Sequence, residues 1–207
     1  MFHLYGFTTQ NTLKTLYVLE EVGIDYEFHL VNLGAGEQRS DDFRRMNPVS
    51  KVPVLAHDDE YLFESGAICR YVANVSESPL YPADPLQRAR VDQWMDFMSC
   101  HLGRWMTKMY FEKMIKPKFD LGPLDEEGIA EALDFARQQL GVIDNHLDGT
   151  DWLANDRLSI ADIFAYAYIE QYRDIDLSLD DYPNVAAWVA RLDARPGIAK
   201  GRARVQR

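Results

Sequence analysis

The sequence predicts an α/β domain built around a mixed sheet, followed by an all-helical domain. Three observations carry this prediction. Strand-like and helix-like segments alternate up to residue 75, a proline-rich stretch follows, and apolar stripes with helical spacing occupy the remainder. A chain of 207 residues is also long enough for two compact domains.

The first part of the chain is expected to form strands and helices in the order βαβαββα. Strands are predicted at residues 2–6, 26–31, 52–56 and 61–63, and helices at residues 11–22, 39–46 and 65–75. Gly23 ends the first helix, and the polar residues 57–60 form the turn of a hairpin. This order implies a mixed sheet with helices on its faces.

The segment 76–85 is expected to link the two domains. Three prolines within its last seven residues interrupt regular structure, so we predict domains over residues 1–78 and 86–207. In the second domain, one apolar stripe runs from Val91 to Met109 and another from Ile129 to Leu147. A last helix is predicted around Trp188.

Charge and composition argue against several functional classes. The 33 acidic and 22 basic residues give a net charge of −11, which disfavours nucleic acid as a partner. No segment approaches the roughly 20 apolar residues that span a bilayer, and no secretory signal is recognised, so neither a membrane partner nor secretion is expected. The two cysteines form no CxxC pair, which fits a cytoplasmic location, and the five histidines show no spacing typical of a metal site.

Pro53 directly precedes residues predicted to form a strand, in the segment NPVSKVPVL at 47–55. Proline cannot donate to a sheet ladder, so this position needs a sheet edge or a special geometry. A cis Val52–Pro53 bond would turn the Val52 backbone outward, where its N–H and C=O can pair with a peptide ligand. An ordinary trans proline at the start of a strand is the commoner arrangement and remains the other interpretation.

Glu64 and Ser65 stand at the start of the third predicted helix. Ser65 fits the N-cap position of that helix. Its N–H and hydroxyl, together with the helix dipole, also form an anion site suited to a carboxylate. Glu64 can hold an ammonium group, so the pair fits the amino-acid end of a γ-glutamyl group. Simple capping explains Ser65 and assigns no role to Glu64.

A polar segment, FTTQNT at 7–12, joins the first strand to the first helix. The Thr9 hydroxyl and the Asn11 amide can donate hydrogen bonds to a thiolate at the helix N-terminus. Lowering a thiol pKa of about 8.5 by roughly two units requires about 2.7 kcal/mol. One or two charge-assisted hydrogen bonds and the helix end can supply this energy. Capping by Thr9 or Asn11 is the simpler interpretation, and the two roles are compatible.

Ser159 and Asp162 form a capping box with Asp in place of Glu or Gln, in the segment WLANDRLSIADI at 152–163. The box precedes a helix rich in apolar and aromatic residues. We interpret it as structural, with no catalytic role.

Together these segments resemble the soluble, cytosolic-type glutathione transferases over nearly the whole chain. The segment 47–55 and ESGAICRY at 64–71 are similar to the family's glutathione-binding core, and 152–163 is similar to its helical-domain capping motif. The end of the chain, with YPN at 182–184, resembles its C-terminal helix. The resemblance implies a thioredoxin-like N-terminal domain plus an all-α C-terminal domain, a cis Pro53, glutathione as co-substrate without a metal, and a homodimer.

The resemblance also implies roles in binding glutathione, residue by residue. Val52, followed by cis Pro53, would pair with the cysteinyl backbone. Glu64 and Ser65 would hold the γ-glutamyl end. Candidates for holding the glycyl carboxylate are Gln38 and Lys51.

The residues at the start of the first helix bear on the class within the family. TQN at 9–11 occupies the position of Ser-Pro-Asn or Thr-Pro-Asn in many bacterial members, most like the nu and theta-like groups, although Gln10 departs from that proline. The loop has no cysteine, which argues against the beta and omega groups. Tyr5 lies near the thiol-activating hydroxyl of the tyrosine-type classes and is the alternative to Thr9.

The resemblance implies a transferase that activates the glutathione thiol for attack on a small electrophile, an activity typical of detoxification. Two alternatives remain open: a nu-like reductase or peroxidase acting on a disulfide or peroxide, and a non-catalytic interaction module of the same fold. The second-substrate pocket is expected between the domains, with Met106 and Tyr110 as lining residues. Core packing is the better interpretation for Trp105 and Met109.

Overall fold

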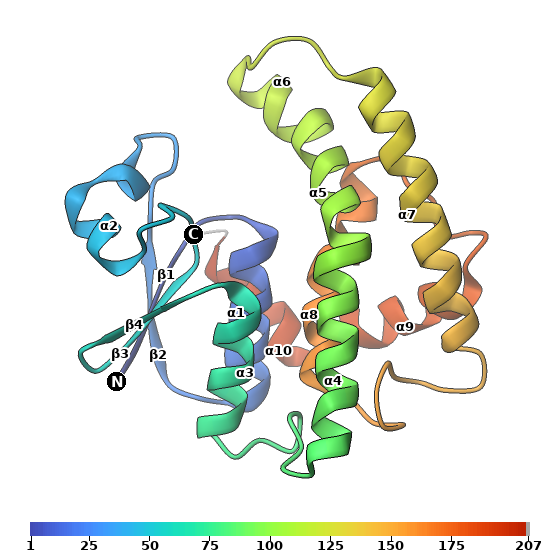
Figure 1. Ribbon diagram of the computed structural model, residues 1–207, viewed down its shortest axis with the longest axis horizontal. Coiled ribbons are helices and arrows are strands. Elements are labelled where there is room, and N and C mark those ends of the chain that lie inside the picture. Colours follow the sequence, from blue (N-terminus) through green and yellow to red (C-terminus); the bar gives the residue numbers. More distant parts are fainter. Residues whose placement is uncertain (206–207) are drawn as a thin grey trace. The chain divides into compact units, whose positions relative to one another are not determined.

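The computed structural model describes residues 1–205 and shows two compact units (Figure 1). The first comprises Met1–Ala83 together with the described residues from Asp193 onward, and the second comprises Asp84–Leu192. The sequence-based division assigns all residues after 86 to the second domain, whereas the closing helix α10 (Pro196–Arg204) packs on α1 (Gln10–Val22) of the first unit. Contacts distant in sequence cause this difference: Arg195 Nε donates to Glu21 Oε2 at 2.8 Å.

The first unit is built on a four-stranded mixed sheet, as the sequence predicts. The strands are β1 (Phe2–Gly6), β2 (Tyr26–Leu30), β3 (Val54–His57) and β4 (Glu60–Phe63), in the spatial order β2-β1-β3-β4. β1 is parallel to β2 and antiparallel to β3, and β3 and β4 form the expected hairpin. Leu4 and Leu55, which are partners in the register, are fully buried at its centre.

Helices cover both faces of this sheet. Figure 1 shows α2 (Asp41–Met46) on one side, and α1 with α3 (Ser65–Val75) on the other. Phe43 of α2 packs with Val31 and Val54. The helix predicted at 39–46 is divided into a 3-10 turn, η1 (Glu37–Arg39), and α2, because the Ser40 side chain accepts a hydrogen bond from Phe43 N and caps a new helix there.

The second unit is all-helical, as expected. Its elements are α4 (Pro85–Phe97), η2 (Met98–Leu102), α5 (Gly103–Tyr110), η3 (Phe111–Ile115), α6 (Lys116–Phe119), α7 (Glu126–His146), α8 (Ile160–Ile169), η4 (Glu170–Asp174) and α9 (Pro183–Asp193). The apolar stripe from Val91 to Met109 predicts one regular helix, but the π-helical turn η2 interrupts it, and a second π-helical turn, η3, follows its end. Every residue of α8 is buried, so this helix forms the centre of the unit. Within residues 1–205, no helix has the length and apolar character needed to cross a bilayer.

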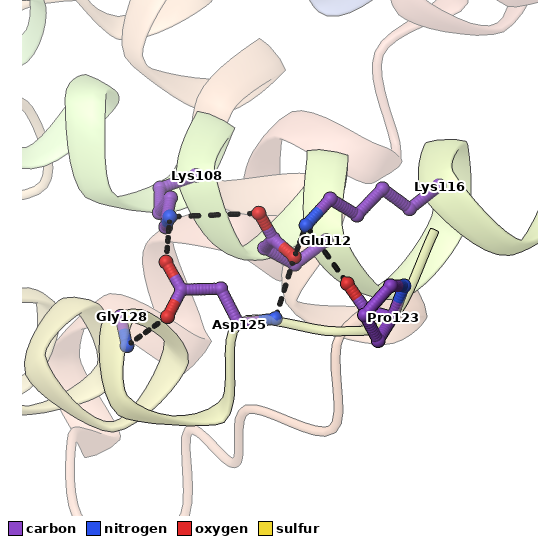
Figure 2. Close-up of polar contacts among 6 residues, drawn as sticks. All are labelled: Lys108, Glu112, Lys116, Pro123, Asp125 and Gly128. Atoms are coloured by element: carbon purple, nitrogen blue, oxygen red, sulfur yellow. Dashed lines mark hydrogen bonds and ion pairs between the residues drawn. The ribbon is translucent and has the colours of Figure 1, made fainter. Parts of the chain in front are cut away.

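The loop between α6 and α7 is held against the continuous helical run α5–η3–α6 by a charged network around Glu112 of η3 (Figure 2). Glu112 is 3 % exposed, and its Oε2 accepts from Lys116 Nζ at 2.7 Å and from Asp125 N at 2.9 Å. Lys108 Nζ lies 2.5 Å from Asp125 Oδ2 and 3.5 Å from Glu112 Oε1. Asp125 in turn caps α7 by accepting from Gly128 N at 3.0 Å. The network therefore joins the helical run α5–η3–α6 to the start of α7.

This network predicts acid-sensitive stability. The bond from Lys116 lowers the pKa of Glu112, and the bond from Lys108 lowers the pKa of Asp125. Their stabilisation is therefore complete above the unfolded-state values of about 4 and is lost as the pH falls through the lower folded values. We expect Glu112→Gln to lower Tm at neutral pH, with the difference from the parent shrinking in acid. Thermal unfolding across pH measures this, with the exposed Glu131→Gln as control, and a difference independent of pH would contradict it.

Candidate functional site

Thr9 caps the N-terminus of α1 directly after β1. Its Oγ1 accepts from Thr12 N at 3.3 Å and lies 3.1 Å from Thr12 Oγ1. The Thr12 hydroxyl also accepts from Phe7 N at 3.3 Å, and Thr12 is fully buried. When Thr12 donates to Thr9, the Thr9 proton remains available to a ligand. The structure therefore confirms capping by Thr9 and keeps a donating role compatible with it.

Asn11 is oriented by a buried lysine that sequence reasoning did not single out. Lys14 is fully buried, and its Nζ donates to Asn11 Oδ1 at 2.7 Å. The Asn11 atom that faces the lysine is therefore the carboxamide oxygen, and Asn11 Nδ2 is left as a donor for another partner. Burial lowers the pKa of Lys14, while Cys69 and Glu64 oppose this shift. The only sign of this role in the sequence is that a lysine lies among the apolar residues of the first predicted helix.

The segment before β3 has the cis Val52–Pro53 bond that the resemblance implies. The interpretation of an ordinary trans proline is therefore wrong. Buried Asn47 holds the preceding loop, since its Nδ2 donates to Lys51 O at 2.7 Å and its Oδ1 accepts from Val49 N at 3.0 Å. β3 begins only at Val54, so Val52 and Pro53 lie before the sheet ladder.

Glu64 and Ser65 stand at the N-terminus of α3, but not in the roles that capping predicts. Glu64 occupies the N-cap position, without a side-chain cap, and Ser65 is the first helical residue. Ser65 as the N-cap was therefore wrong, because the chain turns into the helix one residue earlier. Glu64 has φ of 71°, a conformation that non-glycine residues adopt uncommonly. Ser65 is 8 % exposed, and its N–H belongs to the helix end that lacks intrahelical partners.

Gln38 and Lys51 lie on the segments beside α2 and before β3. Gln38 belongs to η1, and its Oε1 is buried without a hydrogen-bond partner among the described residues. A buried amide oxygen without a donor is costly unless something else satisfies it. Lys51 is exposed, so its ammonium group is accessible to an anionic ligand.

Tyr5 lies on β1, on the sheet face covered by α2. Its ring stacks on His29 at 4.7 Å between centroids and packs against the cluster of Val31, Phe43 and Val54. These contacts give the ring a packing role.

The candidate second-substrate residues differ in accessibility. Met106 is fully buried and Met109 is 1 % exposed, whereas Tyr110 is partly exposed. Burial, with Asp174 and Glu170 nearby, raises the pKa of Tyr110. Trp105 stacks on Phe135 at 4.5 Å and 6°. Of Met106 and Tyr110, Tyr110 is the residue with surface to offer a ligand.

Comparison with known proteins gives matches over nearly the whole chain. Residues 1–74 match the model of the family "Glutathione S-transferase, N-terminal domain", and residues 101–196 match "Glutathione S-transferase, C-terminal domain". The chain is 33% identical to a probable glutathione S-transferase GSTF2 of Oryza sativa subsp. japonica, covering 95% of this chain and 94% of that protein.

Solved structures are similar in fold as well as in sequence. Glutathione S-transferase-I bound with lactoylglutathione has a TM-score of 0.90 at 31% identity and 98% coverage of both chains. A glutathione transferase from Pseudomonas putida, with one glutathione disulfide bound per subunit, has a TM-score of 0.87 at 29% identity, covering 97% of this chain and 90% of that one.

Proposed function

The chain belongs to the glutathione S-transferase family and is a glutathione transferase, and from this premise we propose which of its residues bind glutathione and activate the thiol. One observation supports the proposal most strongly. The N-termini of α1 and α3 in the first unit each carry polar side chains that do not serve as helix caps: Asn11 on α1, and Glu64 and Ser65 at the start of α3. Helix N-termini favour anions through their unpaired N–H groups and their dipole. Glutathione reacting as a thiolate supplies both a thiolate and a γ-glutamyl carboxylate.

The start of α3 is the proposed site for the γ-glutamyl end. The Ser65 hydroxyl and N–H donate to the carboxylate, and the Glu64 carboxylate accepts from the ammonium group. The Glu64 side chain is exposed and makes no capping hydrogen bond. The positive φ of Glu64 is therefore not explained by a helix cap. A strained residue of this kind is the sort of outlier that clusters at ligand-binding positions.

The remainder of the peptide is proposed to lie along the cis segment. The Val52 N–H and C=O pair with the cysteinyl backbone, as an added strand pairs with a sheet edge. Pro53 sets the backbone direction at this point. Gln38 and Lys51 bind the glycyl carboxylate, Lys51 through its exposed ammonium group and Gln38 through its amide Nε2, because a carboxylate only accepts hydrogen bonds.

Thiol activation is proposed for the start of α1. The Thr9 hydroxyl donates to the thiolate, and Asn11 Nδ2, oriented by Lys14, adds a second donor. The thiol releases its proton to solvent, and the thiolate attacks the electrophilic carbon of the second substrate. The C–S bond forms as the bond from that carbon to the leaving group breaks and the leaving group departs with the electron pair. With Tyr5 packed against His29, we assign the activating role to Thr9 and keep Tyr5 as the alternative.

The relatives do not favour a disulfide reductase or a non-catalytic module. The nu or theta-like class stays a prediction. We also propose a small electrophile as second substrate bound near Tyr110, since Met106 is fully buried, together with a homodimer and a cytoplasmic location.

Ser65→Ala tests the assignment of the γ-glutamyl site. We expect Kd for reduced glutathione to rise about 10- to 100-fold, because a hydrogen bond to a charged group contributes about 1.5–3 kcal/mol. Calorimetric titration of the purified protein with reduced glutathione measures the change. Ser178→Ala, which removes an exposed loop hydroxyl that accepts from Asp180 N, is the matched control. Parent-like binding by Ser65→Ala would show that the γ-glutamyl end lies elsewhere.

A further inference from the structure

We propose that His3, Glu27 and His29 form a binding site for one divalent transition-metal ion, with Zn²⁺ as the expected occupant. The site is separate from the residues proposed to bind glutathione, and it does not depend on that function. Sequence reasoning found no ligand spacing among the histidines, because the three residues are brought together by strand pairing.

The parallel pairing of β1 and β2 places all three side chains on one face of the sheet. His3 is the register partner of Glu27, and His29 is the partner of Tyr5, two residues further along. Residues at positions i and i+2 of a strand, and their partners on the next strand, point to the same face. The donor set is thus fixed by the backbone of two hydrogen-bonded strands.

The spacing of the three donor atoms matches what a small ion needs. His3 Nδ1 lies 3.1 Å from His29 Nε2 and 3.2 Å from Glu27 Oε2, and His29 Nε2 lies 3.7 Å from Glu27 Oε2. Tetrahedral coordination with bonds of about 2.0–2.1 Å separates ligand atoms by about 3.3–3.4 Å. An ion can therefore bind all three atoms with side-chain shifts of a few tenths of an ångström.

The chemistry of the donors selects the class of ion. Two imidazole nitrogens and one carboxylate oxygen suit Zn²⁺ and its neighbours in the first transition row, whereas Ca²⁺ and Mg²⁺ prefer oxygen ligands alone. The side chains are 32 %, 58 % and 39 % exposed for His3, Glu27 and His29. Solvent can therefore deliver the ion and fill its remaining coordination position with water.

One ligand is already held in orientation. The His29 ring stacks on Tyr5 at an interplanar angle of 17°, and Tyr5 is itself packed against the cluster under α2. A ligand that is fixed before binding loses less conformational freedom when the ion arrives. Without an ion, the same atoms form a direct contact between the two imidazoles, which is the arrangement that the experiment must distinguish from a metal site.

The test is a calorimetric titration of the untagged full-length chain with Zn²⁺, in the absence of glutathione because its thiol binds the metal. We expect saturable binding of one ion per chain and a rise in Tm with Zn²⁺. Glu27→Gln and His29→Ala each weaken Zn²⁺ binding at least about tenfold, since loss of outer-shell partners alone weakens metal sites by 10- to 100-fold. Co²⁺ absorption spectra report whether imidazole ligands bind the ion.

The exposed His101→Ala in η2 is the control, and it should bind Zn²⁺ as the parent does. Circular dichroism and glutathione binding show whether each variant remains folded, and they separate this proposal from the assignment of the glutathione site. Zn²⁺ binding unchanged in both Glu27→Gln and His29→Ala, or no binding by the folded parent, would overturn the proposal.

Discussion

Replacing Thr9 with alanine lowers the rate of glutathione conjugation at neutral pH by about 10- to 100-fold, while Kd for glutathione changes little. The variant loses a hydrogen bond to the thiolate worth about 1.5–3 kcal/mol, so the pKa of the bound thiol rises towards about 8.5. The acid limb of the pH–rate profile therefore moves to higher pH by about one to two units. At a pH well above that limb, the rates of the two proteins converge.

The pH dependence of kcat with a model electrophile measures this shift, and thiolate absorbance of the bound glutathione checks it without turnover. Thr9→Ser is the matched variant, since serine keeps both the hydroxyl and the cap of α1. Thr9→Ala also loses the cap, which costs about 1 kcal/mol of stability, so Tm is measured beside the rates. If Tyr5→Phe moves the profile and Thr9→Ala does not, the tyrosine is the activating residue.

The second large effect is on stability: Asp162→Ala lowers the free energy of unfolding by about 3–5 kcal/mol. Asp162 is fully buried at the start of α8, where its Oδ1 accepts from Leu153 N at 2.8 Å and Trp188 Nε1 at 3.0 Å. Its Oδ2 accepts from Ser159 N at 2.9 Å and Ser159 Oγ at 3.0 Å. Alanine leaves these donors buried without an acceptor.

Urea unfolding of the parent and the variant measures the difference. Asp162→Asn is the informative partner, because its Oδ1 can still accept while its amide group faces the Ser159 N–H, donor against donor. We expect a loss of stability for it as well. Asp134→Ala, an exposed site on α7, should change stability by no more than about 0.5 kcal/mol. If the parent and Asp162→Ala unfold at the same urea concentration, the four hydrogen bonds of Asp162 do not stabilise this unit.

Features set by neighbouring residues were predictable from the sequence. The capping box of Ser159 and Asp162 is confirmed. The strands were placed within two residues because alternation and turn residues are local signals. The cis form of Pro53 followed from the family resemblance, since its local sequence alone favoured trans.

Features set by distant pairing were not predictable in the same way. The pairing of Lys14 with Asn11 is local, three residues along one helix, but the complete burial of Lys14 depends on packing against α3 and α10, which lie far from it in the sequence. The position of Ser65 depends on the backbone turning at Glu64, a strained conformation that propensities disfavour. The His3, Glu27 and His29 group depends on the register of two strands separated by a whole helix. Spacing along the chain does not encode these relationships.

The packing of α10 on α1 also determines the order in which the protein can be completed during synthesis. The first unit is discontinuous, so the nascent chain must release the entire helical unit before the last element of the first unit exists. Until then, the α1 surface at Tyr17, which Gly201 approaches too closely for any side chain, is uncovered, and Glu21 lacks Arg195. Thr8 Oγ1, next to the proposed thiol-activating Thr9, likewise waits for the carbonyl of Val205. The loop proposed to activate the thiol therefore reaches its final set of contacts only after the helical unit and the α10 segment have been synthesised.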